Sequence, residues 1–207
     1  MQVVDVPGWS SDCKTGTLRR RCVEPMTIWP FNLFDKTRPG SAGTIGTIYG
    51  MIVAQARKPE FYRDFKVPDT VEGRFDLVVL HLWMVVRRLS SEPEGAKLAQ
   101  GLFDHFCEDM DANLREMGVG DLTVPKRMQA FGEAFYGRSV AYDGAFAEGK
   151  DALARALCKN VFSGREPDQA TRLAGYVMSS IAQLAQSDIA AITAGRMQFA
   201  PFSAQEA

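Results

Sequence analysis

A stretch of ten residues without a formal charge, LVVLHLWMVV at positions 77–86, lies between a polar segment and a pair of arginines. The preceding segment, DTVEGR at 69–74, carries residues that cap helices, and Arg87 and Arg88 suit the end of one. A membrane-spanning helix needs about 20 apolar residues, so this stretch is too short to cross a bilayer. The pattern predicts a helix that is buried within a fold that stays in water.

From about Thr44 onward, apolar residues recur with a period of about 3.6, as in amphipathic helices, and strand-like alternation is scarce. The central helix is apolar on two faces, so we expect neighbours to cover it on both. Asp69 or Thr70 is expected to cap its start, and Pro59 to lie in the first turn of a short helix before it. The helices expected from this period span about residues 45–57, 59–65, 70–90, 91–118, 123–149 with a break near 144–149, 150–162 and 168–186.

The fold class predicted from these elements is all-α, a single-domain helical bundle of about six to eight helices with a disordered N-terminal segment. Residues 1–43, which prolines and glycines punctuate, are expected to be a largely unstructured extension. Residues 44–195 form the predicted helical domain and 196–207 a C-terminal tail, and from Ser187 onward we expect one last turn or two before the chain frays. The glycine-containing segment 40–50 fits no phosphate-binding loop, so we interpret it as a linker into a helix.

The start of the chain does not predict a secretion signal. The basic segment LRRR at 18–21 is not followed by the apolar run that a signal peptide requires. Met26 opens a short aromatic segment, so translation starting there, with residues 1–25 as an upstream extension, is an open alternative.

Composition narrows the classes of function. The 207 residues are 46% hydrophobic and carry 24 basic against 25 acidic side chains, a net charge of -1. Such a balance gives no field that favours nucleic acid, and no nucleic-acid motif is present. The four cysteines are spread without a Cys-x-x-Cys pair, which favours a reducing cytoplasm over a zinc ribbon or a disulfide framework.

Two histidines restrict acid–base and metal chemistry. His81 lies within the apolar stretch, where we expect a core histidine that is hydrogen-bonded to a neighbouring helix. His105, Glu108 and Asp109 have a spacing that can hold a metal in a helical bundle. No second set of such ligands is present, so the simpler interpretation is a solvated acidic face at 104–111.

No pattern of a nucleophilic enzyme is present either. The sequence lacks Gly-x-Ser-x-Gly, and Cys107 and Cys158 stand at helical positions beside apolar neighbours, as small buried hydrophobes do. We therefore predict no active site, no cofactor and no metal.

A short connection at 118–128, GVGDLTVPKRM, combines glycines, a proline and two basic residues. A tight turn and a helix start account for the glycines and the proline. They do not account for Lys126 and Arg127, since the dipole at a helix start disfavours cations. The pair indicates a docking surface either for an acidic partner or for phospholipid head groups.

Several separated blocks in this order resemble the ubiquinol-cytochrome c chaperone family over about 48–185. The blocks are IVAQAR at 52–57, PEFY at 59–62, VPDTVEGRFD at 67–76 with the run to Arg88, LREMGVGDL at 114–122, KRM at 126–128 and FYGR at 135–138. The resemblance implies an all-helical, non-enzymatic assembly factor. Because the sequence shows no mitochondrial targeting pattern, we expect a bacterial, cytoplasmic member with peripheral contact at the inner membrane. The resemblance also implies that the chain binds newly made cytochrome b and promotes assembly of the cytochrome bc1 complex.

The resemblance further implies a partner surface among the residues of these blocks. Its candidates are Arg57, Tyr62, Asp69, Glu72, Arg74, Asp76, Gly118, Gly120, Asp121, Lys126, Arg127, Tyr136 and Arg138. The sequence does not separate surface residues from those that hold the fold. It leaves open the oligomeric state, a small helper subunit and contact with a ribosome. A helical adaptor for another membrane-protein client and a metal-binding helical-bundle enzyme stay as alternatives.

Overall fold

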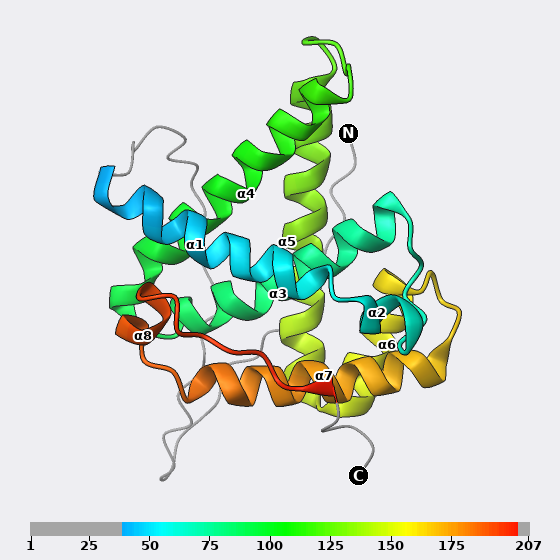
Figure 1. Ribbon diagram of the computed structural model, residues 1–207. Helices are drawn as coiled ribbons and strands as arrows, with labels where there is room; N and C mark the ends of the chain where they lie inside the picture. Colours follow the sequence, from blue (N-terminus) through cyan, green and yellow to red (C-terminus); the bar gives the residue numbers. More distant parts are fainter. Residues whose placement is uncertain (1–38, 203–207) are drawn as a thin grey trace, which may run out of the picture. The chain divides into compact units, whose positions relative to one another are not determined.

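The computed structural model describes residues 39–202, and the side chains from residue 43 onward. Contacts divide the chain into Met1–Lys36 and Thr37–Ala207, and all described residues belong to the second unit. Residues 39–202 contain no strand, which confirms the predicted all-α class. The helices, shown in Figure 1, are α1 (Pro39–Ala56), α2 (Pro59–Arg63), α3 (Val71–Ser90), the 3-10 turn η1 (Pro93–Gly95), α4 (Ala96–Glu116), α5 (Val124–Glu148), α6 (Lys150–Val161), α7 (Pro167–Ala185) and α8 (Ile189–Thr193).

Helix α3 occupies the centre of this unit, as its apolar faces predict. It contacts α1, α4, α5, α6 and α7, so neighbours cover it on several sides. Leu77, Leu80 and Trp83 are almost completely buried. Thr70 caps the helix, since its side-chain oxygen accepts a hydrogen bond of 3.1 Å from the amide of Gly73. Among the described helices, none combines the length and the hydropathy that a membrane-spanning segment requires.

Helix α1 corrects one prediction. The helix predicted over about 45–57 begins earlier, at Pro39, so the whole segment 40–50, interpreted as a linker into a helix, is itself helical. Ile45, Ile48, Tyr49 and Ile52 are buried and face α3 and α4 at helical spacing. Packing of this apolar stripe outweighs the cost of about 1 kcal/mol that each interior glycine adds relative to alanine.

Helices α4 and α5 pack against each other and carry their connecting turn away from α1, α7 and α8 (Figure 1). Helix α5 runs without interruption to Glu148, so the predicted break falls at Gly149, whose φ of 113° favours glycine. Helices α6 and α7 follow as an antiparallel pair that closes the other side of α3. We call the segment 115–128, with the end of α4 and the start of α5, the hairpin tip.

The segment after α7 corrects a second prediction. It does not fray within the described residues, since Met197 and Ala200 are only 2% and 4% exposed. The Phe202 ring stacks on Tyr176 at 5.5 Å, and Phe199 lies 5.1 Å from the His81 ring. Aromatic packing at 197–202 therefore completes the core, with Phe199 and Phe202 as its aromatic side chains.

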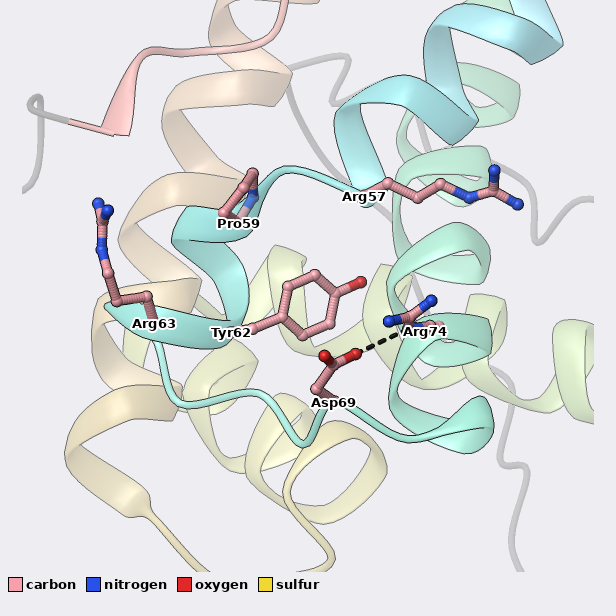
Figure 2. Close-up of a pocket in the computed structure, with 6 residues that line it drawn as sticks. All are labelled: Arg57, Pro59, Tyr62, Arg63, Asp69 and Arg74. Atoms are coloured by element: carbon pink, nitrogen blue, oxygen red, sulfur yellow. Dashed lines mark hydrogen bonds and ion pairs between the residues drawn. The ribbon is translucent and has the colours of Figure 1, made fainter.

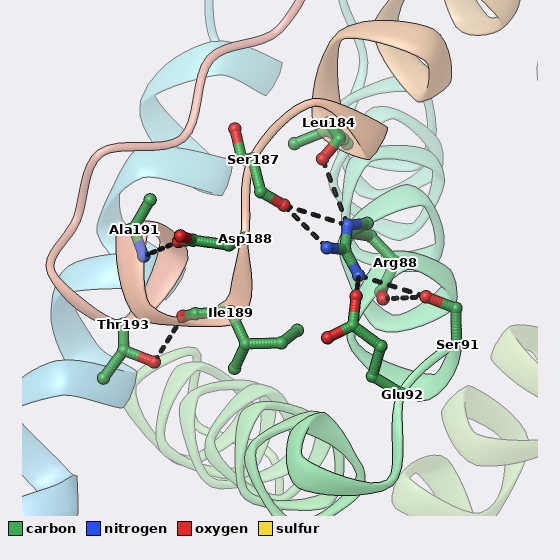
Figure 3. A network of polar contacts seen from close by, with 9 residues as sticks. All are labelled: Arg88, Ser91, Glu92, Leu184, Ser187, Asp188, Ile189, Ala191 and Thr193. Atoms are coloured by element: carbon green, nitrogen blue, oxygen red, sulfur yellow. Dashed lines mark hydrogen bonds and ion pairs between the residues drawn. The ribbon is translucent and has the colours of Figure 1, made fainter.

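Arg88, near the end of α3, anchors this C-terminal segment (Figure 3). Its guanidinium donates to the carbonyl oxygens of Ser187 at 2.7 Å and Leu184 at 3.2 Å, and pairs with Glu92 at 2.8 Å. Asp188 then caps α8 by accepting from the amide of Ala191. The free carbonyls at the end of α7 thus receive a cation, which the C-terminus of a helix favours.

Candidate functional site

Most of the residues predicted for a partner surface gather in three places. The other two residues lie apart from these groups, on exposed faces of helices. Arg57, Tyr62, Asp69 and Arg74 line a pocket beside α2; Asp76 and Arg138 join α3 to α5; Gly118, Gly120, Asp121, Lys126 and Arg127 lie in the hairpin tip; Glu72 and Tyr136 are exposed on α3 and α5.

The pocket of about 520 Å³ lies where α1 ends, α2 turns and α3 begins (Figure 2). Pro59 stands in the first turn of α2, as predicted. The chain re-enters a helix at Thr70 so tightly that a Cβ at Gly73 would lie 2.0 Å from the carbonyl oxygen of Pro68. Only glycine fits there, and the resulting turn brings Asp69 beside Arg74.

Charge and hydrogen bonding organise the pocket wall. Arg74 donates to Asp69 at 2.7 Å, and this hydrogen bond lowers the pKa of the Asp69 carboxyl. The Arg74 guanidinium also lies 6.0 Å from the centre of the Tyr62 ring. The Tyr62 hydroxyl donates to the carbonyl oxygen of Ala56 at 3.0 Å, and partial burial raises its pKa. Both wall residues are therefore held in place by neighbours.

Arg57 differs from the other pocket residues. Its side chain is exposed, and within the described part of the chain its guanidinium has no hydrogen bond or ion pair. Arg63, also at the pocket, is already paired with Asp64 at 2.7 Å. A guanidinium presents donors in a fork that matches a carboxylate. The pocket can therefore bind a carboxylate through Arg57, while Tyr62 offers an apolar wall.

Asp76 and Arg138 form an ion pair of 2.6 Å between α3 and α5, with side chains 10% and 20% exposed. Burial raises the pKa of Asp76 to about 6, and the Arg138 guanidinium opposes that rise. Within the described residues, Nε of Arg138 and the hydroxyls of Ser139 and Tyr142 are buried without a hydrogen-bond partner. The geometry assigns this pair a fold-holding role, which sequence reasoning had not separated from partner binding.

A second contact between α3 and α5 was missed from the sequence. Asp143 accepts a hydrogen bond of 3.2 Å from the indole of Trp83 and pairs with Arg87. Arg87 also lies over the Phe146 ring, 4.7 Å from its centre. These residues are about 60 positions apart in sequence, and a single sequence carries no signal for such pairing.

The hairpin tip is an ordered turn. The amide of Val119 donates to the carbonyl of Leu114 at 3.0 Å and that of Gly118 to Arg115 at 2.9 Å, with Gly118 at a φ of 78°. These two bonds form the Schellman motif that ends many helices. Arg115 holds Asp111 at 2.6 Å and Asp121 at 2.5 Å.

His81 is a core histidine that is bonded to a neighbouring helix, as predicted. Its Nδ1 lies 2.7 Å from the carbonyl oxygen of Leu77, so Nδ1 donates and Nε2 accepts from the Tyr176 hydroxyl at 2.9 Å. Gln55 in turn donates to that hydroxyl. Burial lowers the pKa of His81 to about 4, so the ring is neutral near pH 7.

The acidic face around His105 is less solvated than predicted. Asp109 is half-buried, and its carboxylate accepts a hydrogen bond of 2.7 Å from the Tyr49 hydroxyl of α1. The His105 ring packs edge-on against Tyr49, and its Nδ1 lies 3.8 Å from Glu108. Across residues 43–202, no three histidine, cysteine or acidic side chains converge as metal ligands.

The two described cysteines, Cys107 and Cys158, are half-buried and pack against the hydrophobic core, as their apolar neighbours in the sequence predict. Burial raises the pKa of the Cys107 thiol to about 11, which keeps it protonated. The Cys158 thiol donates to the carbonyl oxygen of Arg165 at 3.3 Å.

Comparison with known proteins gives a consistent result. Ubiquinol-cytochrome c reductase complex assembly factor 1 of Mus musculus is 29% identical over 140 residues, covering 66% of this chain and 48% of that protein. Protein CBP3, mitochondrial, of Saccharomyces cerevisiae is 29% identical over 148 residues, covering 68% of this chain and 44% of that protein. The chain thus spans about half the length of these relatives.

A solved structure agrees with the sequence relatives. The crystal structure of the Cbp3 homolog from Brucella abortus has a TM-score of 0.71 and 36% identity, covering 79% of this chain and 92% of that one. The family described as Ubiquinol-cytochrome C chaperone matches residues 63–199, from the last residue of α2 to Phe199 in the packed C-terminal segment. Since this match covers more than half of the chain, with Asp69 and Arg74 of the pocket, both α3–α5 contacts and the hairpin tip, the chain belongs to the ubiquinol-cytochrome c chaperone family.

Proposed function

We propose that this chain is a non-enzymatic assembly chaperone, which binds newly made cytochrome b and promotes assembly of the cytochrome bc1 complex. The observation that carries the proposal is the family match over residues 63–199. Relatives named as assembly factors of the ubiquinol-cytochrome c reductase complex support it. The site of action that we propose is the cytoplasmic face of the inner membrane, where such a client is inserted.

The physical task of such a protein is to cover apolar surface for a limited time. A membrane protein that has not yet inserted exposes apolar helices to water, and a protein that binds this state lowers its free energy. Release into the bilayer requires contacts that are adaptable and individually weak. Open surfaces suit this task better than a deep pocket.

Helix α5 offers such a surface. Tyr136 and Val140 are 59% and 55% exposed and, being four residues apart, lie on one face. A Cβ added at Gly137 or Gly144 would meet nothing within 4 Å, so the helix is unobstructed there. Small residues allow the backbone of a client helix to approach closely. This face and the pocket are the surfaces that we propose for the client.

Deletion of the gene tests the function directly. We expect membranes of the deletion strain to lose the spectral signal of cytochrome b and the quinol–cytochrome c reductase activity, with recovery on re-expression of the chain. Normal levels of both would contradict the proposal and favour an adaptor for another client. Helper subunits and ribosomes that copurify with the tagged chain would identify further partners.

Substitution of Arg57 tests the pocket. Because Arg57 has no partner among the described residues, Arg57→Glu is expected to leave thermal unfolding unchanged while weakening client binding by about tenfold. The measurement is the amount of cytochrome b recovered with the tagged protein. Arg155→Glu, at an exposed position of α6, is the matched control and should retain full recovery. Equal recovery with both variants would remove the pocket from the client surface.

A further inference from the structure

The hairpin tip exposes large apolar side chains that the helices beneath it do not require. Leu122 is 92% exposed and Met117 is 71% exposed, more than any other large hydrophobic side chain in the described part of the chain. Both belong to the connection between α4 and α5. In Figure 1 this connection lies at the end of α4 that is far from α7 and α8. Val124 and Leu114, by contrast, are buried and fill the space between the two helices.

The turn holds these side chains outward. Two Schellman hydrogen bonds end α4, and the amide of Thr123 donates to the carbonyl of Gly120 at 2.8 Å before α5 begins. The backbone around Met117 and Leu122 is therefore closed by its own hydrogen bonds. An ordered turn presents its apolar side chains without the loss of conformational entropy that a mobile loop would incur on binding.

The charges of the hairpin tip leave two cations available. Arg115 is occupied by Asp111 and Asp121. Lys126 and Arg127 are exposed and have no ion pair within the described residues. The other charged residue of the hairpin tip is Glu116, which is also exposed. Two cations in the first turn of α5 gain nothing from the helix dipole. They are explained if a negatively charged surface lies opposite them.

We propose that the hairpin tip is a membrane-docking site, in which Met117 and Leu122 enter the head-group region of an anionic bilayer and Lys126 and Arg127 contact its phosphates. A specific protein interface needs about 20–30 residues on each side, whereas the turn between α4 and α5 comprises residues 117–123. A narrow, convex tip suits a fluid surface that closes around it. Apolar insertion combined with cationic contact is the usual chemistry of peripheral membrane binding.

Vesicle flotation of the full chain tests this site. The wild-type protein should float with vesicles of phosphatidylglycerol and phosphatidylcholine, should bind less as salt increases, and should not float with phosphatidylcholine alone. Met117→Ser/Leu122→Ser and Lys126→Gln/Arg127→Gln are each expected to lower partitioning by at least about tenfold. Val71→Ser, which alters a 70% exposed valine at the start of α3, is the matched control and should bind as the wild type does.

Each result decides for or against the proposal. Absence of wild-type flotation, or flotation unaffected by the Met117/Leu122 variant, would overturn it. Loss of cytochrome b recovery in the Lys126/Arg127 variant without any vesicle binding would assign the pair to an acidic protein partner instead. Because vesicle binding requires no client, it can persist when the proposed chaperone function fails, and the two proposals are tested separately.

Discussion

Replacing Arg138 with methionine is expected to lower the free energy of unfolding at neutral pH by about 3–5 kcal/mol, since it leaves the buried Asp76 carboxylate without its cation. Burial already raises the pKa of Asp76 to about 6, and loss of Arg138 removes the group that opposes this rise. The folded state then favours a protonated Asp76. Urea unfolding followed by circular dichroism measures the loss.

The sign of the pH dependence makes this prediction specific. A carboxyl whose pKa is higher in the folded than in the unfolded state is protonated first in the folded state on acidification, so the cost of burying its charge falls as pH falls. The loss in Arg138→Met should therefore shrink toward about pH 5. The double variant Asp76→Asn/Arg138→Met carries no buried charge and should be more stable than the single variant. A loss that is independent of pH, or a double variant as unstable as the single one, would contradict this account.

Acidification should act on His81 in the opposite direction. Its pKa is about 4 in the folded protein against 6.5 for an ordinary histidine, because the ring is fully buried. The unfolded chain therefore binds a proton more readily between these values, and stability falls as pH falls from about 6.5 to about 4. The full difference corresponds to about 3 kcal/mol.

The contribution of His81 is isolated by a variant that cannot titrate. As pH falls, the free energy of unfolding of the wild type should decrease relative to that of His81→Gln. Contributions from Asp76 cancel in this comparison, because both proteins contain Asp76. Direct observation is also available, since the imidazole NMR signals of His81 should not titrate above about pH 5. Titration near the ordinary value for histidine would show that the ring is not enclosed as the structure describes.

Local signals accounted for much of the helical framework. Thr70, followed by Glu72 and Gly73, indicates the start of α3, and Pro59 indicates the start of α2. The start of α1 at Pro39 was missed, because the glycines within 40–50 lower helix propensity and the apolar spacing that predicted the helix runs only from Ile45. Tertiary packing against α3 and α4 stabilises this helix, and helix propensity alone does not include the energy of that packing.

The candidate site was predictable only in part, for a similar reason. Arg57, Tyr62, Asp69 and Arg74 come from neighbouring blocks, and a tight turn at Gly73 is sufficient to gather them. Asp76 and Arg138 are 62 positions apart, and only the packing of α5 on α3 shows that they form a pair. The exposure of Leu122 likewise depends on which side of the turn faces solvent, which hydrophobic periodicity does not specify for a short connection.

The packed segment at 197–202 has a consequence for the order in which the protein matures during translation. Phe202 lies 5.0 Å from the Phe61 ring of α2, and Phe199 covers His81, so the last described residues supply one wall of the core behind the pocket. Synthesis proceeds from the N-terminus, and every helix from α1 to α8 is complete before this wall exists. A nascent chain therefore carries α2 without the contact between Phe61 and Phe202 until residue 202 has been made.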